Sequence, residues 1–183
     1  MVACRRRCAL ERGGRWGRGM AVRYGVLSTR LGVLVVASAP GGVCAVSLGD
    51  AAADQVALVQ RRHPGAVAVS VSDCPWAVAV AGHVEGVGRA FEVPVVLEGT
   101  AFQRRVWTAL REVPYGETWT YAHLAEAVGS GPRAVAQACA RNRLAVVVPC
   151  HRIVRSDGSL SGYRWGPWRK AALLALERQA TAG

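Results

Sequence analysis

The chain has 183 residues, enough to bury the core of one domain or of one domain with a small companion. Its 23 Lys and Arg residues outnumber 12 Asp and Glu residues, and the net charge of +11 is equally typical of a protein with a polyanionic partner and of a solvated basic face. The six cysteines follow no disulfide-like or C-x-x-C spacing, which excludes a disulfide-stapled fold and indicates reduced thiols in the cytoplasm.

Residues 1–20 are rich in arginine and glycine and show no hydrophobic periodicity, which predicts a basic, disordered tail. The segment lacks the apolar stretch of a secretory signal. Arginines separate Cys4 from Cys8 and would repel a cation, and no second pair of ligands follows at the spacing of a metal site. We therefore expect no bound metal and no cofactor.

Residues 21–98 are predicted to form an α/β scaffold subdomain. Three β-rich runs precede one segment of helical spacing: Val22–Leu27, Gly32–Ser38, Val43–Leu48 and Asp54–Arg62. The apolar stretch 31–48 is interrupted by Pro40-Gly41-Gly42, which predicts a hairpin and excludes a membrane-spanning helix. This part of the sequence shows no obvious catalytic constellation.

Residues 99–183 are predicted to be mostly helical. Thr100 is a suitable N-cap for a helix with one apolar stripe, formed by Phe102, Val106, Trp107 and Leu110. Pro114-Tyr115-Gly116 ends this helix, and a last helix is expected over Trp168–Arg178.

Between these helices the sequence predicts a pair of short helices. Thr120 caps the first, Tyr121–Val128, and a turn with Pro132 at a first helical position leads into the second, Arg133–Arg141. This is the outline of a helix-turn-helix, although plain helical hairpins share it. The second helix consists almost entirely of small residues. Such a helix either packs tightly on a neighbour or enters the DNA minor groove, with an arginine leading.

The tripeptide Pro149-Cys150-His151 has the surroundings of a reactive thiol. Arginines lie on both sides of it, among them Arg141 and Arg152. Cationic neighbours and a histidine favour the thiolate, which is the nucleophilic form of cysteine. The sequence therefore predicts Cys150 as a nucleophile.

Neighbouring residues seldom point at the same place, so His151 is expected to reach Cys150 through a bridging water. A carboxylate could orient the far side of the imidazole, and Glu177 on the last helix is our candidate; a solvated helix residue is the alternative. Asn142 either holds the turn before Cys150 by side-chain hydrogen bonds or simply ends its helix.

With these residues, the chain resembles the methylated-DNA–protein-cysteine methyltransferases, and most closely the C-terminal half of their bacterial adaptive-response members. The matching motifs are Pro149-Cys150-His151-Arg152 within the run 145–154, with Asn142 upstream, and Ser161-Gly162-Tyr163-Arg164-Trp165-Gly166 downstream. Segments 99–103, 106–107 and 114–118 fit as well, and the likeness covers most of residues 20–180.

The resemblance implies a ribonuclease-H-like α/β N-terminal subdomain and a mostly helical C-terminal subdomain with a helix-turn-helix. It implies a monomer that binds double-stranded DNA through the minor groove and does not bind membranes. Cys150 would take the alkyl group from O6-alkylguanine, and from O4-alkylthymine, once per molecule. By the same likeness, His151 is the base acting through water, Glu177 orients His151, and Asn142 supports the turn.

The resemblance also assigns contacts to DNA and to the extruded base. Tyr121 would press on the target phosphate and help to protonate the leaving guanine, and Arg133 would fill the gap left by the base. The expected DNA contacts are Tyr121, Arg133, Arg141 and Arg152. The expected substrate pocket consists of Cys139, Ile153, Tyr163, Arg164 and Trp165.

Three features depart from the family pattern. The turn before Arg133 is slightly short, Trp165 is bulky beside the substrate pocket, and the regulatory half of the adaptive-response proteins has no counterpart, so we expect repair without that regulation.

Two other functions stay open: a Cys-His hydrolase, which the adjacency of Cys150 and His151 disfavours, and a non-catalytic module that senses DNA damage.

Overall fold

The computed structural model describes residues 22–87, 92–160 and 162–182. The predicted tail, with Cys4 and Cys8, and Ser161 of the downstream motif lie outside these residues. The N-terminal part contains β1 Arg23–Thr29, β2 Gly32–Ala39, β3 Gly42–Gly49, α1 Ala52–Arg62, β4 Val67–Ala68 and α2 Pro75–Glu85, with a one-turn 3-10 helix at Val71–Asp73 before α2.

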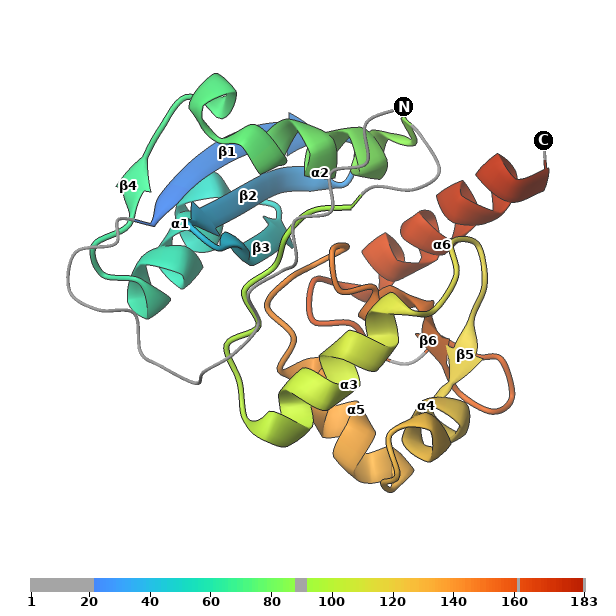
Figure 1. The fold of residues 1–183 in the computed structure, drawn as a ribbon. Coiled ribbons are helices and arrows are strands. Elements are labelled where there is room, and N and C mark those ends of the chain that lie inside the picture. Colours follow the sequence, from blue (N-terminus) through green and yellow to red (C-terminus); the bar gives the residue numbers. More distant parts are fainter. Residues whose placement is uncertain (1–21, 88–91, 161, 183) are drawn as a thin grey trace, which may run out of the picture.

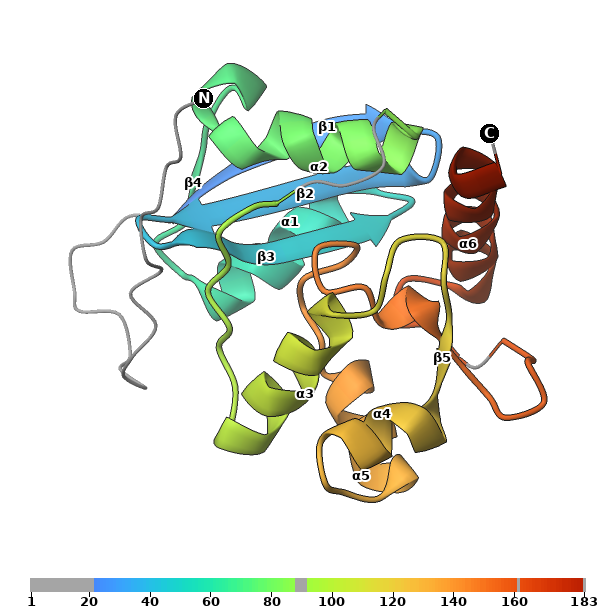
Figure 2. The same cartoon turned by 45° about the vertical axis from the view of Figure 1, so that its right-hand side comes forward.

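The four strands form one mixed sheet in the order β3-β2-β1-β4. β1, β2 and β3 pair antiparallel, whereas β4 runs parallel to β1. Along β2, Leu34 and Val36 pack with α2 in the main core, and Val35 and Ala37 pack with Val59 of α1 on the other face. Both faces are therefore covered, which explains why β2 and β3 are apolar along most of their length (Figures 1 and 2).

The C-terminal part is mostly helical, as predicted (Figure 1). Its elements are α3 Ala101–Arg111, β5 Trp119–Thr120, α4 Tyr121–Ala127, α5 Pro132–Ala140, the 3-10 helix η2 Cys150–Arg152, β6 Ile153–Val154 and α6 Pro167–Ala182. β5 and β6 form a short parallel pair in which Trp119 lies opposite Ile153. The Trp107 indole N–H donates to the Ala138 carbonyl at 2.9 Å, which shows how closely α3 approaches α5.

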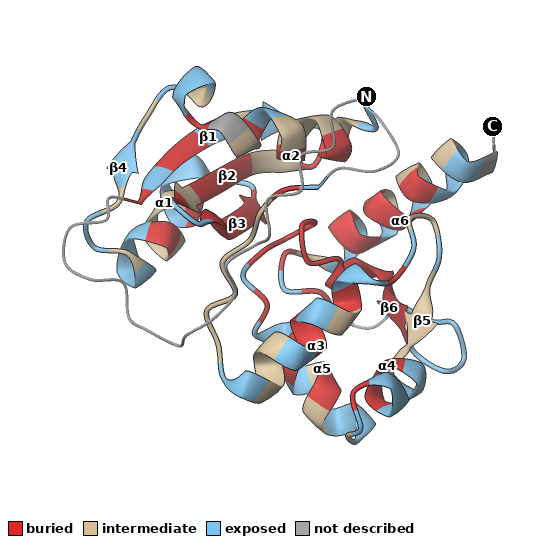
Figure 3. Cartoon of the chain, in the orientation of Figure 1, coloured by how far each residue is buried: buried red, intermediate tan, exposed pale blue. Residues whose placement is uncertain are grey.

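Backbone hydrogen bonds join the two parts. Val46 of β3 donates to the Arg143 carbonyl at 2.8 Å and accepts from Ala145 N–H at 3.1 Å. On α6, Arg169 forms an ion pair with Asp50 and donates to the Leu31 carbonyl. One hydrophobic core runs through both parts (Figure 3), so a boundary at residue 98 stays a prediction.

The structure confirms the predicted caps and corrects some boundaries. Thr100 and Thr120 accept hydrogen bonds from Gln103 N–H and His123 N–H, and Pro132 is the first residue of α5. α1 begins at Ala52, before the predicted Asp54, and α6 extends beyond the predicted 168–178 at both ends. Helix α2 has almost no polar face, so its sequence gives no amphipathic pattern. Among the described residues, no helix combines the length and apolar character needed to cross a membrane.

We predict that Thr100→Ala lowers the free energy of unfolding by about 1 kcal/mol, because Thr100 and Gln103 form a reciprocal capping box at the start of α3. Urea titration followed by circular dichroism measures the change. Thr108→Ala, at an exposed position inside the same helix, is the matched control and is expected to keep or slightly raise stability, because alanine has the higher helix propensity. Equal losses in both variants would contradict a role for the cap.

Candidate functional site

Cys150 begins the short helix η2, directly before the strand β6. Pro149 precedes it with φ −79° and ψ 58°, and the pairing of β6 with β5 fixes the chain after it. The residue is only 7% exposed, within the main hydrophobic core. The thiol therefore lies in a rigid, largely dry position.

Asn142 holds the turn that leads to Cys150. Its side-chain amide N–H donates to Cys150 Sγ at 3.1 Å and to the Val148 carbonyl at 2.8 Å, while its carbonyl oxygen accepts from Leu144 N–H at 2.9 Å. The amide is itself buried at the end of α5. Of the two roles that the sequence left open, this geometry favours support of the turn.

Val146, between Asn142 and Cys150, has a left-handed backbone conformation with φ 68°. A β-branched residue seldom adopts this conformation, which costs on the order of 1–3 kcal/mol. The conformation persists because Arg143 and Ala145, shortly before it in the chain, are hydrogen-bonded to Val46 of β3. The strained turn brings the Val148 carbonyl and the thiol to the same amide group.

The expectation that cationic neighbours favour the Cys150 thiolate is wrong for this structure. Burial raises the pKa of Cys150 to about 11, although the Asn142 hydrogen bond, Lys170 and Arg164 act in the opposite direction. Of the arginines near it in sequence, Arg141 is exposed and Arg152 is engaged elsewhere. The thiol is therefore protonated at neutral pH.

His151 and Glu177 are brought together, as their predicted roles require. The imidazole Nε2 lies 2.7 Å from Glu177 Oε1, and both side chains are fully buried. Because Nε2 faces a carboxylate it carries the proton, which leaves Nδ1 as the basic nitrogen. Nδ1 is buried and has no hydrogen-bond partner among the described residues. Burial lowers the pKa of His151 despite the adjacent carboxylate, so the ring is neutral at pH 7.

Arg152 was expected to contact DNA, and the structure places it elsewhere. It is 8% exposed, and its Nε and Nη2 donate to Glu177 at 2.8 and 3.0 Å, while Nη1 donates to the Val113 carbonyl at 2.7 Å. Carboxylate and guanidinium meet in bidentate geometry. Arg152 is thus a buried counter-ion and has no face turned to a ligand.

Glu177 is the centre of this network. Burial alone would raise its pKa, but the hydrogen bonds from His151 and Arg152, together with the nearby His83, outweigh that effect and lower it well below the ordinary value. Gly116 N–H donates to the same carboxylate at 3.2 Å. Glu177 is therefore ionised throughout the physiological range, and the alternative of a solvated helix residue is excluded by its burial.

The predicted pocket residues surround this network only in part. Tyr163 packs edge-on against His151, with ring centroids 6.4 Å apart, and its buried hydroxyl has no hydrogen-bond partner among the described residues. Cys139 and Ile153 are buried in the main core that also contains Cys150. Trp165 packs against Tyr163, and it also lines a separate cavity beside β3.

The predicted DNA contacts, apart from Arg152, lie where a ligand can reach them. Arg133 is exposed at the start of α5, and Arg141 is exposed just beyond its end. Tyr121, the first residue of α4, is half-buried. Arg164, which was predicted to line the substrate pocket, is also exposed, and one guanidinium N–H lies 3.5 Å from the Ala140 carbonyl. These residues flank the helix pair α4–α5.

Sequence reasoning missed two basic side chains near the site, those of a lysine and a histidine. Lys170 is fully buried on α6 and donates to the Ile153 carbonyl, and burial lowers its pKa. His83 of α2 is buried with Nε2 3.7 Å from Glu177. Lys170 shares a helical stripe with Leu173, Leu174 and Glu177, a signal that could have been found in the sequence; His83 gives no such signal. No cluster of three His, Cys, Asp or Glu side chains in the described ranges could hold a metal ion.

Comparison with protein families finds one match that includes the thiol. Residues 101–179 match the family described as 6-O-methylguanine DNA methyltransferase, DNA binding domain. Among curated proteins, the bifunctional transcriptional activator/DNA repair enzyme Ada of Escherichia coli K12 is 43% identical over 172 residues, covering 89% of this chain and 47% of that protein. The chain therefore spans about half the length of this relative.

Two further relatives match along most of their own length. The inducible methylated-DNA–protein-cysteine methyltransferase of Bacillus subtilis is 41% identical over 127 residues, covering 67% of this chain and 71% of that protein. A crystal structure of Mycobacterium tuberculosis OGT in complex with DNA superposes with a TM-score of 0.73 at 31% identity, covering 87% of this chain and 94% of that one. The likeness includes both parts of the fold.

We predict that Glu177→Gln lowers the free energy of unfolding by about 3 kcal/mol, because it leaves the buried Arg152 charge without its counter-ion. Glu112→Gln, at an exposed position after α3, serves as the control and is expected to change stability little. Both are measured by urea unfolding. A small loss for Glu177→Gln would mean that the buried pair does not stabilise the fold.

Proposed function

Because this chain belongs to the family of methylated-DNA–protein-cysteine methyltransferases, we propose that it repairs DNA by moving the alkyl group of O6-alkylguanine, and of O4-alkylthymine, onto Cys150. The proposal rests on the arrangement of three side chains around a buried thiol. Asn142 donates a hydrogen bond to Cys150 Sγ, and the neighbouring His151 has Nε2 facing Glu177 and Nδ1 without a hydrogen-bond partner among the described residues. The thioether formed is stable, so each molecule acts once.

The transfer requires the thiol proton to leave as the new bond forms. Cys150 releases its proton through a water to Nδ1 of His151, and Glu177 stabilises the imidazolium. The sulfur attacks the alkyl carbon, the bond from that carbon to O6 breaks, and its electron pair goes to the guanine. Tyr121 supplies the proton that the guanine takes up and regains one from solvent. The buried Tyr163 hydroxyl, unpartnered among the described residues, is suited to donate to the base.

DNA would be bound through the helix pair α4–α5, acting as a helix-turn-helix. The side chains of Ala134, Val135, Ala136 and Ala138 are small, and the exposed residues of α5 are Pro132, Arg133, Gln137 and Ala140, which suits the narrow minor groove. Arg133 would fill the gap left by the extruded base. We further propose a cytoplasmic monomer, and a ribonuclease-H-like class for the N-terminal sheet, whose order β3-β2-β1-β4 supports that assignment.

The test of this function is intact-protein mass spectrometry after incubation with duplex DNA containing one O6-methylguanine. We expect a gain of one methyl group per protein, located on Cys150 by peptide mapping, and no gain in Cys150→Ser. DNA binding without any gain in mass would overturn the proposal in favour of a damage-sensing module. Release of many product molecules per protein would indicate a hydrolase.

The pH dependence of transfer follows from His151. Its pKa is lowered from 6.5, so the neutral base persists as the pH falls to that value. We expect single-turnover rates to stay nearly constant between about pH 8 and pH 6.5 and to decline only below that range. Quench-flow measurements on lesion-containing duplex give the profile. A rate that already halves above pH 6.5 would contradict a neutral resting His151.

Trp165 is expected to restrict the size of the adduct, because its buried ring packs directly against Tyr163. We predict that the protein is consumed slowly by free O6-benzylguanine and that Trp165→Ala speeds this reaction by about tenfold or more. Loss of the free thiol, followed by mass spectrometry, measures the rate. Equal rates for the two proteins would show that Trp165 does not limit the pocket.

A further inference from the structure

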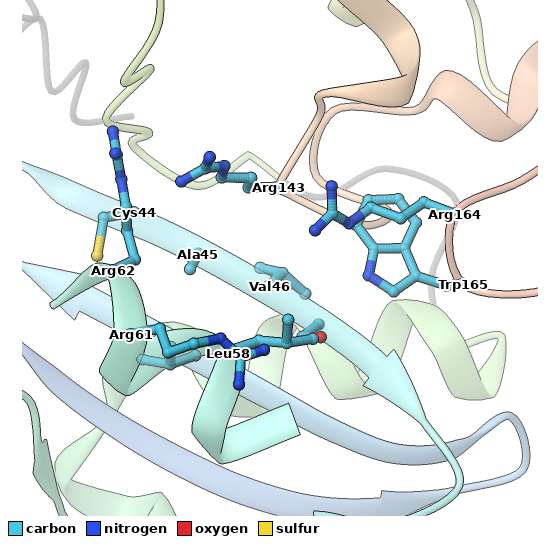
Figure 4. A pocket seen from close by; sticks show the side chains of 11 residues that line it. Cys44, Ala45, Val46, Leu58, Arg61, Arg62, Arg143, Arg164 and Trp165 are labelled. Carbon is cyan, nitrogen blue, oxygen red and sulfur yellow. The ribbon is translucent and has the colours of Figure 1, made fainter. Parts of the chain in front are cut away.

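A cavity of about 330 Å³ lies between α1, β3 and the C-terminal part, outside the network around Cys150. Its size is at the lower end of the roughly 300–1,000 Å³ found for small-molecule pockets. Figure 4 shows four arginines around it: Arg61 and Arg62 from α1, and Arg143 and Arg164 from the C-terminal part. None of Cys150, His151, Asn142 or Tyr163 lines it.

The positive charge around this cavity is largely uncompensated. Arg62 forms an ion pair with Glu98 at 2.9 Å. In the described part of the chain, Arg61, Arg143 and Arg164 form no ion pair, and no acidic residue lines the cavity. Burial, together with the nearby charges of Arg62 and Arg164, lowers the pKa of Arg143, although Glu98 acts in the opposite direction. Four guanidinium groups beside this single carboxylate keep a net positive charge, which favours the binding of an anion.

The remainder of the lining is apolar and preformed. Val46, Leu58 and Trp165 contribute to the walls, and Trp165 offers an aromatic ring beside Arg164 (Figure 4). Val46 is fixed by its hydrogen bonds to Arg143 and Ala145, so the arginines of the two parts keep their separation. An arginine rim over an apolar and aromatic wall matches a ligand with a phosphate and a planar ring.

We propose that this cavity binds one nucleotide, with the phosphate among Arg61, Arg143 and Arg164 and the base against Leu58 and Trp165. The nucleotide has two possible sources, a free mononucleotide or an unpaired nucleotide of a DNA strand. The second source is sterically reasonable because Arg164 also reaches the end of α5 at the Ala140 carbonyl. The proposal concerns a site separate from Cys150 and does not depend on alkyl transfer.

The experiment is calorimetric titration of the full chain with adenosine 5′-monophosphate. We expect saturable binding of one molecule, weakened about tenfold or more in Arg61→Ala/Arg143→Ala. Arg111→Ala, an exposed arginine on α3 outside the cavity, is the matched control and should bind like the parent. Adenosine, which lacks the phosphate, should bind far more weakly. Because charge removal can disturb folding, Arg61→Lys/Arg143→Lys is included, and it should retain most of the binding.

A second experiment distinguishes a free mononucleotide from an unpaired nucleotide of a DNA strand. Lesion-free duplexes with a blunt end and with a single-stranded extension are compared by fluorescence anisotropy. If a strand nucleotide occupies the cavity, the extension raises affinity for the parent and for Arg111→Ala but not for Arg61→Ala/Arg143→Ala. If only the mononucleotide responds to those substitutions, the ligand is free. If neither the mononucleotide nor the extension depends on Arg61 and Arg143, the proposal is wrong.

Discussion

The buried carboxylate of Glu177 is the interaction on which the C-terminal part of the molecule depends. It accepts hydrogen bonds from His151, Arg152 and the Gly116 backbone, which come from η2 and from the turn before β5. An isolated carboxylate would be very costly to bury, so these donors and the acceptor require one another. Because α6 carries the carboxylate, the position of this helix determines where His151 lies, and with it the position of the unpartnered Nδ1.

The burial that makes ion pairing necessary for Glu177 also keeps Cys150 and His151 uncharged in the protein without substrate. Cys150 is a neutral thiol and His151 a neutral base, each held in that form by its removal from water. A neutral buried thiol reacts slowly with oxidants and small electrophiles. In the proposed transfer, reactivity therefore depends on a substrate placed beside the sulfur, with a proton path open to Nδ1. The strained backbone of Val146 and the hydrogen bond from the Asn142 amide hold the sulfur in a fixed position.

Much of the fold could be predicted from local sequence signals, because caps, turns and periodicity act over a few residues. Thr100, Thr120 and Pro132 mark helix starts that the structure has. The predictions that failed concern residues whose interaction partners are distant in the sequence. Arg152 looked like a free cation because its partner lies 25 residues away on another helix, and its burial could not be read from its neighbours. The same holds for the thiolate, since only the tertiary fold shows that burial outweighs the nearby positive charge.

The place of Glu177 along the chain has a consequence for biosynthesis. Proteins emerge from the ribosome N-terminus first, so Cys150, His151 and Arg152 leave it before the carboxylate that organises them. In that interval two buried donors lack their acceptor, and the nascent site stays unformed. A chain whose translation stalls before α6 thus contains Cys150, His151 and Arg152 but lacks the carboxylate that holds His151 and Arg152 in place. The site therefore requires α6 to dock before His151 and Arg152 have their acceptor.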